Sequence, residues 1–271
     1  MSLPALRMAI RLRLLTTALS AFGMALVIVM VGALFPTVGD SIGKLDLPKG
    51  VATLLGGADY GTITGWMRSE IGSVYGPLVI AYTGISVAVT STAGEEEGGI
   101  LALTLAHPIE RSRLLLAKAG AVAISVVLVA LGTLVGLIIG VAVAGGGINA
   151  GNLTALAVHL TFLGWTTGAL ALALAATTGR KAVASGAAAA FALLGILVNG
   201  FAPLVGALEW LKYLSLFYYY EGHDPIGRGV DVADLMVLAV ATIVLTVIAV
   251  FGIRDRDLRG YMGTGAGRVI A

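Results

Sequence analysis

Few residues in this sequence are of types and spacings that could carry out chemistry. Glu221, His223 and Asp224 form a Glu-x-His-Asp string, which combines the imidazole and carboxylate ligands that divalent metals use. The spacing fits no standard zinc pattern and Pro225 follows directly, which favours a polar turn over a metal site. There is no cysteine, so thiolate metal sites, cysteine nucleophiles and disulfides are excluded.

The sequence contains no string that matches an ATP-binding phosphate loop. Such a loop is rich in glycine and ends in Gly-Lys-Ser/Thr. The nearest string, residues 39–45, is one residue short and has Leu45 where the magnesium-binding hydroxyl should follow Lys44. We therefore expect no cofactor and no catalytic residue in this chain. If ATP and Mg²⁺ are used, a separate chain binds them.

Several polar and aromatic residues stand within or beside long apolar stretches. His159 and Asn199 lie inside such stretches, where ionisable groups are costly and often functional. A neutral side chain bonded to a neighbouring helix is inexpensive, so packing is the favoured interpretation and a substrate path is the alternative. Tyr218 and Tyr219 belong to an aromatic cluster that is typical of an interfacial belt, with an outer gate as the alternative.

The elements that must position these residues are apolar. Hydrophobic residues make up 58% of the 271 and charged residues 12%, against about 45–50% and about 25% in soluble domains. A bilayer core needs about 20 apolar residues in a helix. Six stretches qualify: 14–35, 71–93, 119–144, 153–178, 182–208 and 235–253. We predict an all-α, polytopic membrane protein with one transmembrane domain over residues 1–271 and a flexible cytoplasmic tail at 254–271.

The distribution of charge predicts how the chain crosses the membrane. With the N-terminus inside, 12 of the 17 basic residues and six of the 15 acidic residues fall inside. The inside segments then carry a net charge of +6 and the outside segments −4, as the positive-inside rule requires. Both termini are predicted to be cytoplasmic. The overall charge of +2 is too small to argue for a nucleic-acid partner.

Glycines recur at every fourth position in two of the predicted spans. Gly132, Gly136 and Gly140 lie in the third span, and Gly164 and Gly168 lie in the fourth. Small residues at this spacing form a face on which another helix can approach closely in lipid. We favour packing within one chain over packing between two chains.

The most charged inside loop, residues 94–118, has three parts. Glutamates 95–97 come first, a short apolar run at 100–106 follows, and Pro108 then precedes Arg111, Arg113 and Lys118. The pattern predicts a short amphipathic helix along the cytoplasmic face. Composition alone favours an interfacial loop whose basic residues anchor the topology.

The order of residues in this loop resembles that of the ABC-2 type permeases. In that family a glutamate-rich start leads to Gly, a leucine-rich turn, Pro, an aliphatic residue, x, Arg and then Lys. The matching positions here are Glu95, Glu96, Glu97, Gly98 or Gly99, Leu101, Leu103, Leu105, Pro108, Ile109, Arg111 and Lys118. The order of spans matches as well, and residues 65–67 and 214–219 match more loosely.

The resemblance implies a function and a set of partners. It implies that the loop is a coupling helix which docks into a separate P-loop ATP-binding subunit, through Glu96, Glu97, Leu103, Pro108, Ile109, Arg111 and Lys118. It also implies export across the cytoplasmic membrane by a pair of permeases, either two copies or two similar chains. High Gly and Ala content without cysteine is typical of a GC-rich bacterium, so the expected location is a bacterial cytoplasmic membrane.

Two other function classes stay open at this point. An ion-coupled secondary transporter usually places carboxylates or broken helices at the bilayer midplane, and the predicted spans have no acid there. An intramembrane enzyme needs a nucleophile with a base, or a metal cluster, and the spans offer one histidine and no acid. Copurification of an ATPase would separate the exporter from both.

Overall fold

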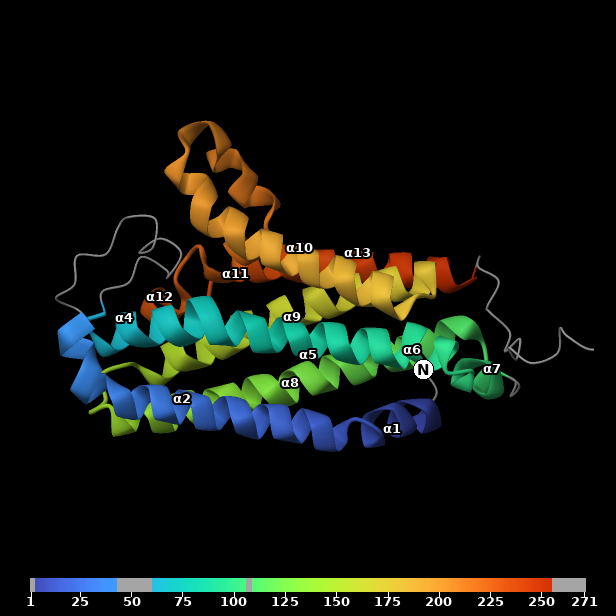
Figure 1. The fold of residues 1–271 in the computed structure, drawn as a ribbon, viewed down its shortest axis with the longest axis horizontal. Helices are drawn as coiled ribbons and strands as arrows, with labels where there is room; N and C mark the ends of the chain where they lie inside the picture. Colours follow the sequence, from blue (N-terminus) through green and yellow to red (C-terminus); the bar gives the residue numbers. More distant parts are fainter. Residues whose placement is uncertain (1–2, 43–59, 106–108, 255–271) are drawn as a thin grey trace, which may run out of the picture.

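The computed structural model describes residues 3–42, 60–105 and 109–254 of the chain. These residues form helices and turns and contain no strand (Figure 1). In chain order the helices are α1 (Leu3–Arg11), α2 (Leu14–Ile42), α4 (Ile63–Met67), the π-helix η1 (Arg68–Tyr75), α5 (Gly76–Ser91), α6 (Ala93–Glu97), α7 (Ile100–Leu105), α8 (Arg111–Val143), α9 (Ala150–Thr178), α10 (Lys181–Phe201), the 3₁₀ turns η2 (Ala202–Leu204) and η3 (Gly206–Leu214), α11 (Leu216–Glu221), α12 (Pro225–Arg228) and α13 (Val232–Arg254).

Six helical segments of the described residues are long and apolar enough to cross a membrane. They are Leu14–Gly39, Ile63–Glu97, Arg111–Val143, Ala150–Thr178, Lys181–Phe201 and Val232–Arg254. The prediction of an all-α protein with six spans is confirmed for this part of the chain. The predicted site residue Pro108 and the predicted tail beyond Arg254 lie outside the described residues.

The second span runs from Ile63 to Glu97, and its helix type changes along its length. It begins as α4, widens into the π-helix η1, and becomes α-helical again at Gly76. Pro77 explains the wide turn, because proline has no N–H to donate and its ring crowds the carbonyl one turn earlier. This irregular stretch sets the direction of Arg68 and Ser73, which form contacts described below.

The fifth span is shorter than the sequence indicated. We expected an apolar stretch over 182–208, but α10 ends at Phe201 and the chain continues through η2 and η3. Pro203 and Gly206 account for the break, since proline cannot continue the hydrogen-bond ladder and glycine is a weak helix former. In Figure 1 this orange segment leaves the bundle and returns to it at α11.

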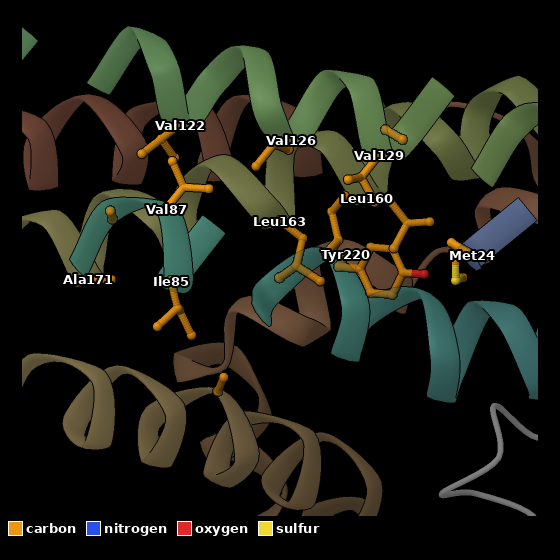
Figure 2. Close-up of a cluster of buried hydrophobic side chains, with 14 of the residues drawn as sticks. Met24, Ile85, Val87, Val122, Val126, Val129, Leu160, Leu163, Ala171 and Tyr220 are labelled. Atoms are coloured by element: carbon orange, nitrogen blue, oxygen red, sulfur yellow. The ribbon is translucent and has the colours of Figure 1, made fainter. Parts of the chain in front are cut away.

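Helix α9 is the centre of the bundle. It packs against α5, α8, α10 and α13, and α2 packs on the outer side of α8. Figure 2 shows the core where α5, α8 and α9 meet, with Val87, Val126 and Leu163 facing one another. Leu160, Leu163 and Val126 are completely buried, so these three helices share one apolar core.

The regularly spaced glycines serve contacts within the chain. A methyl group added at Gly132 would lie 2.6 Å from the carbonyl oxygen of Ala21, and one at Gly136 would lie 2.7 Å from Cα of Ala25. Both contacts are to the backbone of α2, which explains why α2 and α8 pack so closely. Gly168 on α9 also serves a contact within the chain, since its added methyl would lie 2.6 Å from a side-chain carbon of Val122 on α8. The favoured interpretation of intrachain packing is therefore correct for these glycines.

We expect Gly136→Ala to destabilise the protein, because the new methyl group must push the backbone of α2 away. Forcing an extra carbon into a close-packed contact costs about 1–3 kcal/mol. Gly23→Ala is the matched control on the same helix pair, since nothing lies within 4 Å of its added methyl. Thermal unfolding in detergent should show a lower Tm for Gly136→Ala and an equal or higher Tm for Gly23→Ala, because alanine favours the helix more than glycine does. Equal Tm values for the two variants would contradict this packing.

The bundle has two ends, which are named here by the short helices that they carry. Helices α6 and α7 lie at the α6 end, together with α1 and the last turn of α13 (Figure 1). Helices α4 and α12 lie at the opposite end, the α12 end. Basic residues gather at the α6 end: Arg7, Arg11, Arg13, Arg111, Arg113, Lys118, Arg180, Lys181 and Arg254.

Candidate functional site

The predicted coupling segment begins where the second span bends. The α-helical ladder of α5 is interrupted at Thr92, with φ −113° and ψ −87°, and α6 starts at the next residue. Helix α6 ends at Gly98, and Gly99 has φ +74°, a left-handed conformation that glycine adopts without strain. This turn directs the chain into α7.

Lys118 holds α6 against the third span. It is 3% exposed, and its Nζ lies 2.8 Å from Oε2 of Glu95. The same ammonium group also donates to the carbonyl oxygen of Ser91, at the end of α5. Arg13, at the start of α2, adds a second positive charge near Glu95, and burial lowers its pKa while Glu95 opposes this shift. Lys118 is therefore an internal contact of the segment.

Glu97 makes a second connection, to the fifth span. Its Oε1 accepts a hydrogen bond of 2.8 Å from the backbone N–H of Lys181, the first residue of α10. The first N–H groups of a helix have no partner within the helix and favour a negative charge. Arg180, the capping residue of α10, supplies no side-chain hydrogen bond, so Glu97 caps this helix from another part of the chain.

The remaining residues of the segment lie closer to the surface. Leu103 on α7 is 73% exposed, while Ile109 and Arg111 are half-buried at the start of the third span. Glu96 of α6, in contrast, is a buried residue. The structure thus joins Glu97 and Lys118 to neighbouring spans and places Leu103, Ile109 and Arg111 at or near the surface of the α6 end.

A groove runs between α5 and α10 and has a volume of about 520 Å³. Its walls are mostly apolar and include Tyr82, Ile85, Leu193 and Phe217. The half of the groove nearer the α6 end is also lined by residues with polar groups, namely the hydroxyl residues Ser86, Thr90 and Ser185 and the ammonium-bearing Lys181. Pockets for drug-sized molecules occupy about 300–1,000 Å³ and combine apolar walls with a few polar groups. The groove has the size and the lining of such a pocket.

His159 is completely buried and joins three helices. Its Nδ1 lies 3.1 Å from the carbonyl oxygen of Tyr220, and its Nε2 accepts a 3.2 Å hydrogen bond from the backbone N–H of Asp231. Since Nε2 accepts, Nδ1 carries the proton and donates to Tyr220, which fixes a neutral tautomer. His159 therefore packs α9 against α11 and the start of α13. Neither His159 nor Asn199, which is half-buried on α10, lines the groove.

Polar contacts at the α12 end join the second span to the segment after the fifth. Arg68 of η1 pairs with Asp224, and the Ser73 hydroxyl donates to Glu221. The hydroxyl of Tyr220 donates to the carbonyl oxygen of Gly72 at 2.7 Å. Burial raises the pKa of Glu221, while the Ser73 hydroxyl and the Arg68 charge oppose the shift. We call these contacts the outer cluster.

The tyrosines of α11 and Tyr213 of η3 contact one another edge to face beside the outer cluster. Tyr218 and Tyr219 are half-buried, and the ring of Tyr218 lies 4.9 Å from that of Tyr213 and 5.3 Å from that of Tyr219. Phe217, rather than either tyrosine, lines the groove. Phe217 belongs to the same aromatic cluster of the sequence as the two tyrosines, but neither it nor Tyr82 was predicted as a site residue, because contact with the groove depends on how α5, α10 and α11 pack.

The structure separates the members of the Glu-x-His-Asp string. Glu221 and Asp224 both face η1, whereas His223 turns towards the start of α13 and lies 2.6 Å from Oδ2 of Asp234. Asp224 has φ +58°, and this sharp bend separates His223 from the other two side chains. A polar turn, which the sequence favoured, is what these residues form.

Comparison with known proteins agrees with this architecture. Residues 4–254 match the model of the family described as "Multidrug efflux system permease Rv1217c, C-terminal domain". No curated protein matches the chain. The match spans all six membrane-spanning segments, both ends of the bundle and the groove between α5 and α10. The chain therefore belongs to this family of multidrug efflux permeases and is a multi-pass membrane protein of a transport family.

Proposed function

We propose that the chain is the membrane-spanning permease of an ATP-driven ABC-2 type exporter, with ATP and Mg²⁺ bound by a separate P-loop ATP-binding subunit. The observation that carries the proposal is the way α6 is attached. Helix α6 follows α5 directly after Thr92. Its Glu95 forms an ion pair with Lys118 of α8, and its Glu97 caps the start of α10. A force applied to this one short helix acts on three spans at once, as a coupling element requires.

In this proposal the coupling residues divide into two groups. Glu97 and Lys118 are positioning residues, because they tie α6 to neighbouring spans. Leu103, Ile109 and Arg111 contact the ATP-binding subunit, and Pro108, which lies outside the described residues, is retained as a coupling residue on the resemblance of the sequence. Glu96 supports α6 from its buried side. The α6 end then faces the cytoplasm, in agreement with the basic residues gathered there.

The groove between α5 and α10 is the proposed path of the substrate. Its walls suit an apolar molecule of drug size, and its polar groups lie towards the cytoplasmic half. Helix α10 exposes Leu193, Leu194 and Leu197, so the groove is open at the side of a single chain. A second permease, either a copy of this chain or a similar one, would close it. Rearrangement of the pair then releases the substrate on the α12 side, across a bacterial cytoplasmic membrane.

The test is a pull-down of the ATP-binding subunit combined with transport in the same membranes. Arg111→Glu should weaken the pull-down and abolish transport, because reversing one partner at a partly buried interface costs about 2 kcal/mol or more, roughly 30-fold in affinity. Pro108→Ala should keep the pull-down but lose transport, since alanine leaves the backbone freer than proline does. Glu209→Lys, which reverses an exposed charge on η3 away from the α6 end, is the control and should leave both unchanged.

Other results would replace the proposal. If Arg111→Glu pulls down the subunit and transports as the wild type does, the segment is only a positive-inside anchor. Transport driven by a proton or sodium gradient, with no ATP-binding partner present, would make the chain a secondary transporter. Turnover of a substrate by the purified chain alone would make it an intramembrane enzyme.

A further inference from the structure

Three side chains of metal-binding type meet at the α12 end, apart from the outer cluster. His223 follows α11, while Asp231 and Asp234 stand at the start of α13. Nδ1 of His223 lies 2.6 Å from Oδ2 of Asp234 and 3.9 Å from Oδ2 of Asp231. One ligand atom from each residue lies within 4.8 Å of the other two.

This combination of atoms suits a divalent transition metal. One imidazole nitrogen and two carboxylate oxygens are ligands that Zn²⁺ binds at about 2.0–2.2 Å. Two such ligands of a tetrahedral ion stand about 3.4 Å apart, and the observed separations of 2.6 and 3.9 Å lie on either side of that value. Because His223 is 46% exposed on its side chain, an ion could enter from the surface and keep a fourth position for water.

The start of a helix explains only part of the arrangement. Asp231 caps α13 by accepting the N–H of Asp234, but it uses Oδ1 and leaves Oδ2 towards His223. The Asp234 side chain is 5% exposed, and a buried carboxylate requires a positive partner. Neither helix capping nor the outer cluster accounts for an imidazole placed between the two carboxylates.

We propose that His223, Asp231 and Asp234 bind a divalent transition-metal cation of the Zn²⁺ type. The ion would replace the proton shared between His223 and Asp234 and would join the end of α11 to the start of α13. Phe217 of α11 lines the groove, so a bound ion would also fix one wall of that groove. The site does not depend on the ATP-driven mechanism.

Zn²⁺ binding to the purified protein tests the site directly. The protein is prepared in detergent without a polyhistidine tag, treated with chelator, and dialysed against buffered Zn²⁺. One ion per chain is expected, and Zn²⁺ should raise the Tm of the wild type. His223→Ala and Asp231→Asn should each weaken binding at least 10-fold and remove the rise in Tm, because each removes a ligand. Glu209→Gln, an exposed carboxylate beside Lys212, is the matched control and should bind as the wild type does.

The outcomes separate a metal site from a helix cap with a hydrogen bond. Asp231→Asn retains a side-chain oxygen for the helix cap and should keep the Tm of the metal-free protein, whereas His223→Ala leaves the buried Asp234 carboxylate without its hydrogen-bond partner and should lower that Tm. Asp234→Asn preserves the shape of the side chain and removes its charge, so it tests the third proposed ligand, which is buried. The proposal is overturned if the wild type shows no saturable binding, or if both His223→Ala and Asp231→Asn bind Zn²⁺ with wild-type affinity.

Discussion

Replacing Lys118 with methionine should abolish transport while all six spans still insert. The ammonium group of Lys118 is the buried partner of Glu95 and also donates to the Ser91 carbonyl oxygen. Removing one partner of a buried ion pair costs about 3–5 kcal/mol, because the other charge is left without compensation. The loss falls on the attachment of α6 to α8, so the second and third spans should no longer move together. ATP-driven transport in vesicles and thermal unfolding of the purified chain measure the two effects.

A paired substitution is the control for this result. Lys118→Met combined with Glu95→Gln removes both charges, so the stability of the double variant should recover most of the loss. Transport should stay low, because α6 is still detached from α8. A Lys118→Met protein that transports at the wild-type rate would show that this pair does not take part in coupling.

Replacing Arg68 with methionine should open the α12 end of the bundle. Arg68 pairs with Asp224 and lies near the half-buried Glu221, so both carboxylates would lose a positive neighbour. Hydrogen bonds to charged groups contribute about 1.5–3 kcal/mol each. The chain has no cysteine, so Ser69→Cys can report the change, since Ser69 is completely buried one residue from Arg68. An impermeant thiol reagent applied to intact cells should label that cysteine at least 10-fold faster in the Arg68→Met background.

The matching control is an ion pair on the surface. Lys212→Met breaks the pair with Glu209 inside η3, and exposed pairs contribute little, so labelling at Ser69→Cys should not change. Equal labelling rates in the presence and absence of Arg68 would show that the outer cluster does not close this end. Labelling from the cytoplasmic side alone would reverse the proposed orientation.

The sequence was sufficient for the spans because each depends on local composition over about 20 residues. The same reasoning placed the interruption between the second and third spans at residues 94–118, but the second span extends to Glu97 and α8 already begins at Arg111. It also identified the glycine face of the third span. It overestimated the fifth span, since Val205 and Leu208 are apolar but follow Pro203 and Gly206, and the chain leaves the bundle there. Hydropathy measures solubility in lipid and contains no information on where a backbone turns.

The contacts of the candidate site were harder to predict because their partners are distant in the sequence. Arg68 and Asp224 are separated by 156 positions, and Lys118 and Glu95 by 23. Proximity in the sequence was even misleading for His223, which was grouped with Glu221 and Asp224 but meets Asp231 and Asp234 across a bend. Pairing of this kind is decided by helix packing. Pro77 disturbs the second span, but a proline alone does not show whether a helix will kink, end or widen, so the π-helix at Arg68–Tyr75 could not be predicted.

The two sets of charged contacts on the second span stand far from each other. Ser73 and Ser91 are separated by 18 residues, about 27 Å along a helix at 1.5 Å per residue, and the stretch between them is packed mainly by apolar side chains. Energetic effects at such a distance normally add. A double-mutant cycle between Lys118→Met and Arg68→Met therefore has a plain meaning. A zero interaction energy would mean that the Lys118 and Arg68 contacts act independently. A non-zero interaction energy would measure how strongly the second span couples its two ends.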